Sequence, residues 1–240
     1  MKAVELSARM QALTDMVSKG RTVCDVGCDH GWVSIYLVQQ GIASKVFAMD
    51  VRSGPLDRAK EHICEYQLEP YIEARLSDGL KNLQIGEADC MVCAGMGGPL
   101  MMKILKEGRD KAWAMQELIL QPQSEIGQFR KFLREERYKT IEENIIYEDG
   151  KYYPMMKVIP LVDSKATEAV SEEEQALWDA FGELLLKEKH PVLQQYLEFS
   201  VNQVENLLEH LKTQGTIRAE GRVAELKREL CMLRRAQTYK

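Results

Sequence analysis

Short apolar runs rich in β-branched residues alternate with segments of helical periodicity from residue 22 to about residue 161. This alternation is typical of parallel strands joined by crossover helices, so we predict an open α/β sheet. The predicted strands are residues 22–26, 45–49, 72–76, 88–94, 117–120, 140–147 and 152–159. The last two flank an Asp-Gly pair at 149–150, which favours a hairpin, so we expect the sheet to end antiparallel.

Helical periodicity fills the gaps between these strands. We predict helices at residues 6–18, 31–40, 53–66, 99–106 and 124–137. Gly20, Gly41 and Gly108 follow three of these segments and Pro99 begins another, which is the distribution expected at helix ends.

The pattern changes after Pro160, where residues 161–171 are polar and without period, and no strand pattern follows. We therefore predict two domains, residues 1–161 and residues 162–240. The second should hold a helix at 172–187 and longer helices at 191–215 and 217–239. Leucine and valine recur in the longer helices at spacings of three and four, which favours a coiled-coil-like hairpin about a Gly215-Thr216 turn.

Composition narrows the class of protein. A chain of 240 residues, 45% of them hydrophobic, can bury a full core with a smaller appendage. The formal net charge of −5 lacks the basic excess of many nucleic-acid-binding proteins, although local basic patches can still bind RNA. Charged residues interrupt the first ten positions and the longest uncharged stretch is short and glycine-rich, so we expect a cytoplasmic protein with no membrane partner.

The sequence Asp-Val-Gly-Cys-Asp-His-Gly at 25–31 lies where the first strand meets a helix, the place where such folds bind adenosine-containing cofactors. The dinucleotide fingerprint needs glycine at three offsets, which here are Gly27, Asp29 and Trp32. A carboxylate at Asp29 would repel a diphosphate but suits the cationic sulfonium and ammonium groups of S-adenosylmethionine. The alternative is an ordinary tight turn that binds no ligand.

Acidic residues end the next two predicted strands. Asp50 can accept hydrogen bonds from ribose hydroxyls, or it can simply cap the following helix. The sequence Ser77-Asp78-Gly79 would put a carboxylate beside an adenine edge, or it is a plain Asp-Gly turn. Cys90 and Cys93 have a metal-ligand spacing but face opposite sides of a strand, so we expect no metal.

A glycine cluster, Ala94-Gly-Met-Gly-Gly-Pro99, follows the fourth predicted strand. Enzymes that methylate exocyclic amines usually place an Asn or Asp, two prolines and an aromatic residue here, and this chain does not. A ring nitrogen with an in-plane lone pair needs no proton removed before it attacks a methyl group, so positioning can suffice. The glycines could also offer backbone N–H groups to a phosphate, or could only let the helix pack closely.

These motifs occur together and in order, with Gly54-Pro55-Leu56 and Leu120-Gln-Pro-Gln123 between and after them. In this combination the chain resembles the bacterial tRNA (adenine-22-N1)-methyltransferases, the TrmK-type family. The resemblance implies a Rossmann-like class I S-adenosylmethionine methyltransferase sheet with a coiled-coil-like helical domain. It also implies methyl transfer to N1 of an adenine in the D-arm region of tRNA. The chain departs from the family pattern at Cys28, at residues 31–34 and at Gln123.

The motifs and the resemblance together predict the site residues. Expected cofactor-binding residues are Asp25, Gly27, Asp29, His30, Gly31, Asp50, Ser77, Asp78, Gly79, Ala94, Gly95 and Met96. Asp29 and Asp78 are candidate catalytic residues, because a carboxylate would stabilise the cationic 1-methyladenine product. Expected RNA-binding residues are Arg9, Gly97, Gly98, Gln121, Gln123, Arg130, Arg134, Arg137, Arg234 and Arg235.

Each basic run could equally be a solvated helix face. We favour a monomer. Other candidate functions are methylation of another RNA, a small molecule or a protein, and a non-catalytic module whose helical hairpin binds a partner.

Overall fold

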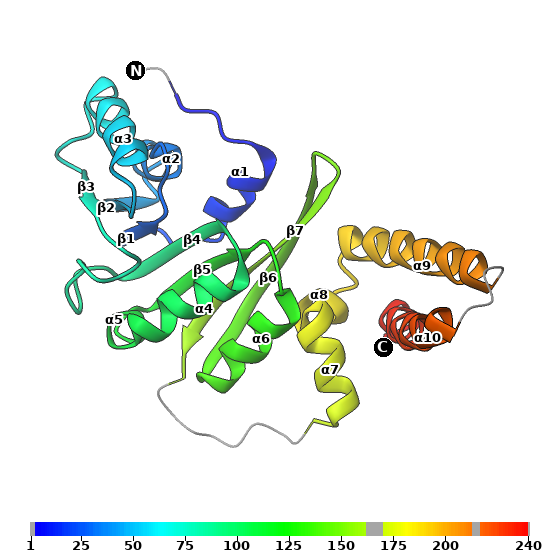
Figure 1. Ribbon diagram of the computed structural model, residues 1–240. Helices are drawn as coiled ribbons and strands as arrows, with labels where there is room; N and C mark the ends of the chain where they lie inside the picture. Colours follow the sequence, from blue (N-terminus) through cyan, green and yellow to red (C-terminus); the bar gives the residue numbers. More distant parts are fainter. Residues whose placement is uncertain (1–2, 162–169, 213–216, 240) are drawn as a thin grey trace. The chain divides into compact units, whose positions relative to one another are not determined.

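The computed structural model describes residues 3–161, 170–212 and 217–239, and the chain divides into two compact units, Met1–Thr167 and Glu168–Lys240 (Figure 1). The predicted domain boundary at 161/162 adjoins residues 162–169, which lie outside the described residues, so its exact position stays a prediction.

The first unit is built on one seven-stranded sheet with the order β3-β2-β1-β4-β5-β7-β6. The first five strands in chain order pair in parallel, and β7 pairs antiparallel with both β5 and β6. All seven predicted strands are confirmed, as is the antiparallel end of the sheet. The strands are β1 Arg21–Val26, β2 Ala43–Asp50, β3 Ile72–Leu76, β4 Cys90–Met96, β5 Glu117–Pro122, β6 Tyr138–Glu148 and β7 Lys151–Pro160.

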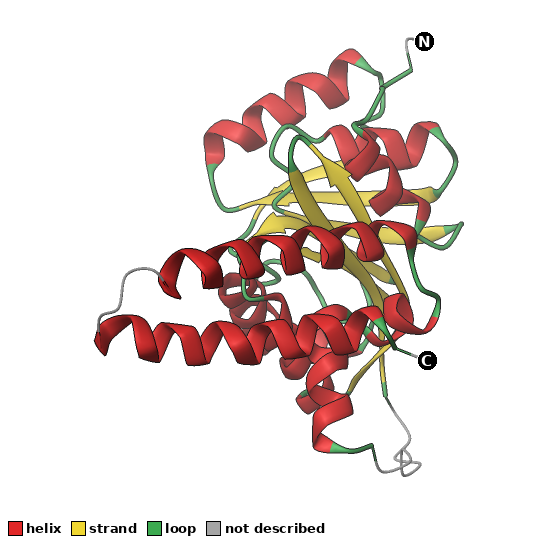
Figure 2. Cartoon of the chain, turned by 90° about the vertical axis from the view of Figure 1, so that its right-hand side faces the viewer, coloured by secondary structure: helices red, strands yellow, loops and turns green. Residues whose placement is uncertain are grey.

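Helices cover both faces of the sheet (Figures 1 and 2). Neighbouring residues of β1 show this arrangement, because Val23 packs in the core formed with α1–α3 and Cys24 packs in the core formed with α4–α6. The predicted helices are all present, and the short α5, a segment after Gly108, was not predicted. The helices are α1 Ala8–Asp15, α2 Trp32–Gln39, α3 Ser53–Glu65, α4 Gly98–Glu107, α5 Arg109–Trp113 and α6 Ile126–Glu135.

The second unit is helical in its described residues. The single helix predicted at 172–187 is wrong: Gly182, at φ 93° and ψ 125°, separates α7 (Glu172–Phe181) from α8 (Glu183–Lys187). Two long helices follow, α9 (Pro191–Lys212) and α10 (Ile217–Gln237), and they lie side by side in Figure 2. Most of the leucines and valines that recur in these two helices are buried, including Leu197 and Leu226, and others are half-buried. The predicted Gly215-Thr216 turn lies outside the described residues.

The β6–β7 hairpin extends past the rest of the sheet. The pairing of β7 with β5 ends at Leu120 opposite Met156, whereas β6 and β7 pair with each other as far as Glu148 opposite Lys151. The tip therefore stands beyond the carboxyl end of β5, beside α1 (Figure 1). No helix among the described residues is long and apolar enough to cross a membrane.

Candidate functional site

The turn after β1 is a strained backbone segment that only glycine and short polar residues adopt readily. Gly27, Asp29 and Gly31 have φ values of 78°, 50° and 77°. The backbone N–H groups of Gly27 and Cys28 both donate to Met49 O, at 2.7 Å and 2.9 Å, which fixes the turn against the end of β2. The φ of Gly27 favours glycine, and a Cβ there would also overlap the Met96 methyl group, so the end of the Met96 side chain would have to move.

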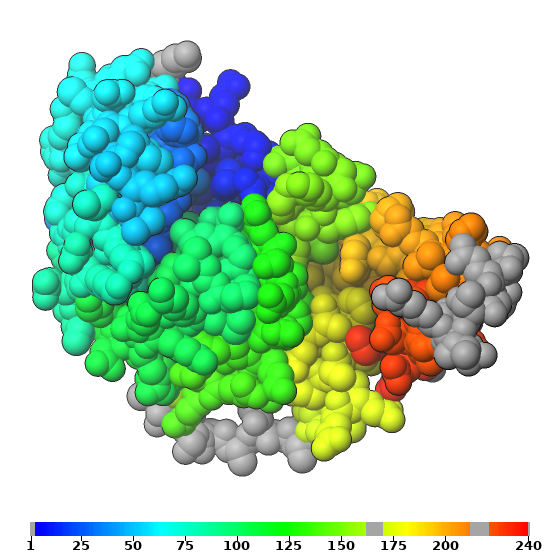
Figure 3. All heavy atoms as spheres, in the orientation of Figure 1, coloured from blue at the N-terminus to red at the C-terminus, as the bar shows by residue number. Residues whose placement is uncertain are grey.

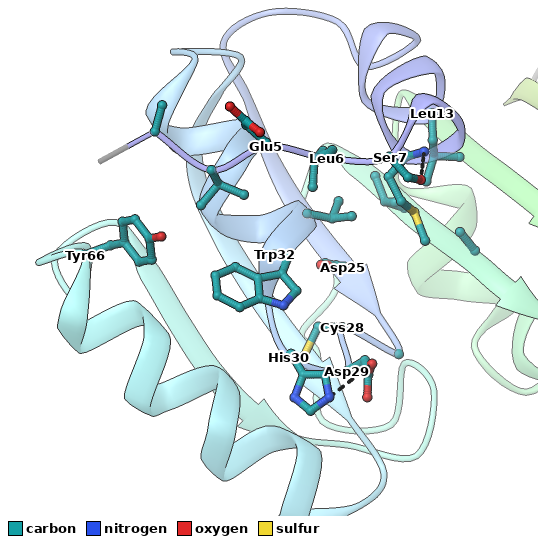
Figure 4. Close-up of a pocket in the computed structure, with 17 residues that line it drawn as sticks. Glu5, Leu6, Ser7, Leu13, Asp25, Cys28, Asp29, His30, Trp32 and Tyr66 are labelled. Carbon is teal, nitrogen blue, oxygen red and sulfur yellow. Dashed lines mark hydrogen bonds and ion pairs between the residues drawn. The ribbon is translucent and has the colours of Figure 1, made fainter. Parts of the chain in front are cut away.

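This turn forms one wall of a cavity of about 730 Å³ (Figure 4). The other walls come from the segment before α1, from α1 itself, from the start of α2, from Tyr66 at the end of α3, and from β4. Figure 3 shows the surface of this region, with the N-terminal segment and α1 in dark blue beside α2 and α3. The lining residues are Ala3, Val4, Glu5, Leu6, Ser7, Met10, Leu13, Asp25, Gly27, Cys28, Asp29, His30, Trp32, Val33, Tyr66, Val92 and Ala94.

The charged residues that line the cavity are all acidic. Its described lining includes the carboxylates of Glu5, Asp25 and Asp29 and contains neither lysine nor arginine. An acidic wall of this kind attracts a cationic ligand and repels a diphosphate. The cavity therefore has the electrostatic character that the sequence predicted for the turn at 25–31.

Asp25 is the most buried of these carboxylates, at the carboxyl end of β1. Its Oδ2 accepts a 2.6 Å hydrogen bond from Ser34 Oγ of α2. Burial, with a smaller contribution from the nearby Asp50 carboxylate, raises the pKa of Asp25 to about 6, although the Ser34 hydrogen bond opposes the shift. A cation beside this carboxylate would lower its pKa again, so Asp25 suits a positively charged ligand.

Asp29 and His30 lie at the open side of the cavity. The Asp29 side chain is 60% exposed, and its Oδ2 lies 3.6 Å from His30 Nε2. The Nδ1 atom of His30 is buried and has no hydrogen-bond partner in the described structure, although the residue lines the cavity. An unpartnered buried nitrogen at a cavity wall leaves one polar position that a ligand can satisfy.

Aromatic residues extend the wall beyond His30. The Trp32 ring stacks on His62 with centroids 4.0 Å apart, and Tyr66 meets Trp32 edge-on at 6.2 Å. The sequence analysis assigned no binding role to Trp32, to Tyr66 or to residues 3–7. The aromatic character of Trp32 next to the glycine turn was the available signal, whereas nothing in the local sequence of residues 3–7 marks them as a cavity wall.

Asp50 at the end of β2 and Ser77, Asp78 and Gly79 after β3 lie outside the lining of the cavity, as do the predicted cofactor residues Gly31, Gly95 and Met96. Asp50 is buried, and its oxygens accept hydrogen bonds from the backbone N–H groups of Asp29 (3.2 Å) and Arg52 (2.9 Å). Ser77 is also buried and donates to Gly79 O at 2.8 Å. Asp78 is exposed and paired with Lys81, which lowers the pKa of the Asp78 carboxyl. The nucleoside-binding roles of these residues stay predictions.

The glycine cluster after β4 is tied to the neighbouring loop. Gly95 has a φ of 78°, and the backbone N–H of Gln123 donates to Met96 O at 2.8 Å. The backbone N–H of Gly98 lies 3.2 Å from Ser124 O and 3.3 Å from Ser124 Oγ, and it donates to both. A phosphate would therefore have to displace Ser124 from this N–H, and the contact of Gly98 with RNA stays a prediction. The role of Gly97 stays a prediction.

The predicted RNA-binding side chains fall into different environments. Arg130 is buried and its Nε lies 2.9 Å from Glu143 Oε1, which argues against contact with RNA, so its RNA-binding role stays a prediction. Gln121 is also buried, where it donates to Pro122 O and accepts from Arg9 Nη1, which leaves no exposed amide for RNA. The partners Glu143 and Arg9 are distant in sequence from Arg130 and Gln121, so no local pattern predicts these two contacts.

The remaining predicted RNA contacts are on the surface or partly exposed. Gln123, Arg134 and Arg137 are exposed or half-buried. Arg234 and Arg235 lie in exposed ion pairs, 2.5 Å from Glu205 and 2.9 Å from Glu173, and such pairs exchange readily with a phosphate partner. Among the described residues, no group of histidine, cysteine and acidic side chains could hold a metal ion.

Comparisons with known proteins agree on one family. A family model described as a methyltransferase domain matches residues 6–156. The chain is 37% identical over 156 residues to the tRNA (adenine(22)-N(1))-methyltransferase of Bacillus subtilis, a segment that covers 65% of this chain and 66% of that protein.

Solved structures extend the similarity to both units. The crystal structure of the B. subtilis m1A22 tRNA methyltransferase TrmK superposes with a TM-score of 0.83 at 30% identity, and covers 98% of this chain and 99% of that one. A putative tRNA (m1A22) methyltransferase of Streptococcus pneumoniae, solved in complex with S-adenosyl-L-methionine, has a TM-score of 0.82 at 27% identity, and covers 97% and 100%.

Proposed function

We propose that this chain transfers a methyl group from S-adenosylmethionine to N1 of adenine 22 in tRNA. The chain belongs to the TrmK-type family of methyltransferase-domain proteins. The observation that carries the proposal is the acidic cavity at the carboxyl end of β1. The base and its position come from the activity for which the B. subtilis relative is named.

The cavity residues fit this cofactor. S-adenosylmethionine supplies an electrophilic methyl group on a positively charged sulfur. Asp25 and Asp29 would hold its cationic groups, and the left-handed turn at Gly27 would let the backbone approach it closely. His30 Nδ1, which is buried without a partner, would accept or donate one further hydrogen bond. A dinucleotide would instead bring a diphosphate against these carboxylates.

The reaction needs little proton chemistry from the protein. N1 of adenine attacks with an in-plane lone pair, and no hydrogen has to leave that nitrogen. The residues of this chain therefore act by orienting the base and by stabilising the positive charge that the product carries. Asp29 suits the second role, because its exposed carboxylate lies at the open side of the cavity. Asp78 suits it less, because it is paired with Lys81 outside the cavity lining.

The substrate base must be unpaired when it reacts. N1 lies on the Watson–Crick edge, so the adenine has to leave any helix before it reaches the cavity, at a cost of a few kcal/mol. We expect residues 95–97, at the carboxyl end of β4, and Gln123, directly after β5, to form the surface over which it enters. A tRNA substrate favours a cytoplasmic location, and we infer that the protein acts there as a monomer.

The proposal is tested by product analysis. The purified chain is incubated with labelled S-adenosylmethionine and an unmodified tRNA transcript, and the digested nucleosides are separated. We expect 1-methyladenosine, and we expect its loss in a matched transcript with guanosine at position 22. Formation of N6-methyladenosine alone, or labelling of a protein or small molecule with no labelling of tRNA, would contradict the proposal.

A further inference from the structure

A pair of tyrosines, one exposed and one half-buried, lies at the tip of the β6–β7 hairpin. Tyr147 and Tyr152 lie opposite each other in the antiparallel register, with ring centroids 4.6 Å apart and planes inclined at 43°. Tyr147 is 53% exposed and Tyr152 is half-buried, and neither belongs to the buried core. The pair therefore offers aromatic surface outside the cavity described above.

The strand register places this pair at the same edge of the sheet as the cavity. The β5–β7 pairing ends at Met156, and Tyr152 lies four residues further along an extended strand. At about 3.3 Å per residue, Tyr152 stands roughly 13 Å beyond that point. The carboxyl ends of β1 and β4, where the cavity lies, belong to the same edge of the sheet.

The side of the sheet on which the tyrosines lie follows from strand alternation. Glu143, Ile145 and Tyr147 share one face of β6. Glu143 pairs with Arg130 of α6, so this is the face that α6 covers. The tyrosines thus lie on the same side as α6 and α4, the two helices that follow Gln123 and the glycine cluster.

The opposite face of the hairpin tip is hydrogen-bonded to the N-terminal end of α1. Glu148 accepts hydrogen bonds from Ser7 Oγ and from the backbone N–H of Arg9, each 3.1 Å long. The Arg9 guanidinium lies 4.7 Å from the ring centroid of Tyr153. Because Ser7 also lines the cavity, these contacts hold the tyrosine pair at a fixed position relative to the cavity wall.

We propose that Tyr147 and Tyr152 form a stacking platform for an unpaired nucleotide of the RNA substrate, next to the adenosine that is methylated. The inference rests on the proposed function. When the target adenine leaves its helix, the neighbouring bases lose a stacking partner, and an aromatic ring can replace it. Stacking on tyrosine tolerates any base, so the platform positions the RNA without reading its sequence.

The test replaces both rings. The double variant Tyr147→Ala/Tyr152→Ala should raise both the Kd and the KM for tRNA roughly 10- to 100-fold, the loss expected for a stacked base. Affinity for S-adenosylmethionine should stay unchanged, as should the salt dependence of tRNA binding, because no phosphate contact is removed. The matched Tyr147→Phe/Tyr152→Phe variant should retain tRNA affinity. Tyr71→Ala, at a similarly exposed tyrosine before β3, should behave as the wild-type protein.

A pair of arginines supplies the contrasting control. Arg134→Gln/Arg137→Gln should flatten the salt dependence of tRNA binding, because it removes charge rather than aromatic surface. Unchanged tRNA affinity in the tyrosine double variant would overturn the inference, and so would a changed oligomeric state with unchanged affinity, which would assign the platform to a second copy of the chain. A wild-type protein that binds tRNA without methylating it would defeat the proposed function, while the binding measurements would still decide the role of the tyrosines.

Discussion

The turns after β1 and after β4 are both rich in glycine and both lead from a parallel strand into a helix, yet they provide different chemistry. The first is surrounded by carboxylates and borders the cavity. The second contains no charged residue from Ala94 to Pro99, and the N–H of Gly98 is tied to Ser124. Glycine therefore supplies only the backbone path in both turns, and the side chains around that path decide which ligand can bind.

The two turns are also in direct contact. The Met96 side chain from the second fills the space that a Cβ on Gly27 of the first would need. A change in one turn can therefore alter the other, and variants that separate their functions would test the comparison.

The largest effect is expected for Gly27→Ala. The new Cβ would overlap Met96 and would hold a φ of 78°, which costs about 1–3 kcal/mol of unfolding free energy for a residue other than glycine. We expect affinity for S-adenosylmethionine, measured by calorimetry, to fall at least about 100-fold, roughly 2.7 kcal/mol. Gly41→Ala is the matched control, because Gly41 has a φ of 63° but no atom lies within 4 Å of the position that a Cβ would take there. Equal cofactor affinity for the two variants would show that the close approach to Met96 is irrelevant.

A smaller effect is expected for Asp29→Ala. Removal of one partly exposed carboxylate from the cavity should weaken binding of the cationic cofactor about 10-fold, because solvent screens the charge. The turnover number should fall as well if Asp29 stabilises the cationic product. Binding and single-turnover rates separate the two effects. Wild-type values for both would remove Asp29 from the proposed mechanism, and Asp78→Ala serves as the comparison at an exposed carboxylate outside the cavity.

The pH dependence of cofactor binding should report on Asp25. With a pKa of about 6, the ionised fraction of this carboxyl falls from about 90% at pH 7 to about 10% at pH 5, so affinity for a cation should fall by up to about 10-fold over that range. The direction follows because only the ionised form attracts the cofactor. Asp25→Asn should bind weakly with a flatter profile, measured by titration at each pH. Parallel profiles for the two proteins would assign the pH dependence to another group.

Almost no effect on cofactor affinity is expected for Gly98→Ala. Its Cβ would lie 2.5 Å from Ser124 O, so the loop after β5 must shift, at a cost typical of overpacking, about 1–3 kcal/mol. The KM for tRNA should rise several-fold while the Kd for S-adenosylmethionine changes by less than about twofold. Denaturant unfolding and steady-state kinetics measure both. A loss of cofactor affinity as large as that of Gly27→Ala would show that the two turns work as one unit.

The local sequence pattern predicted the strands and helices of the first unit well, because the hydrophobic periodicity of a strand or a helix is a property of consecutive residues. The seven strands were found for this reason, and the Asp-Gly pair at 149–150 marked the hairpin. The break at Gly182 was missed, because a single glycine within a periodic segment does not by itself end a helix. The burial of Arg130 could not be predicted, because its partner Glu143 lies on another element and the two meet only after the sheet has formed.

The acidic turn at 25–31 and its preference for a cationic cofactor could be read from the sequence alone, because the charge of Asp29 and the missing glycines are properties of adjacent residues. The shape of the cavity required the tertiary structure. The segment before α1 joins its wall through long-range contacts, such as Ser7 with Glu148, that no local pattern encodes. The same packing aligned two opposed tyrosines with the edge of the sheet at which the cavity lies, since strand register, unlike residue charge, is decided by pairing between distant segments.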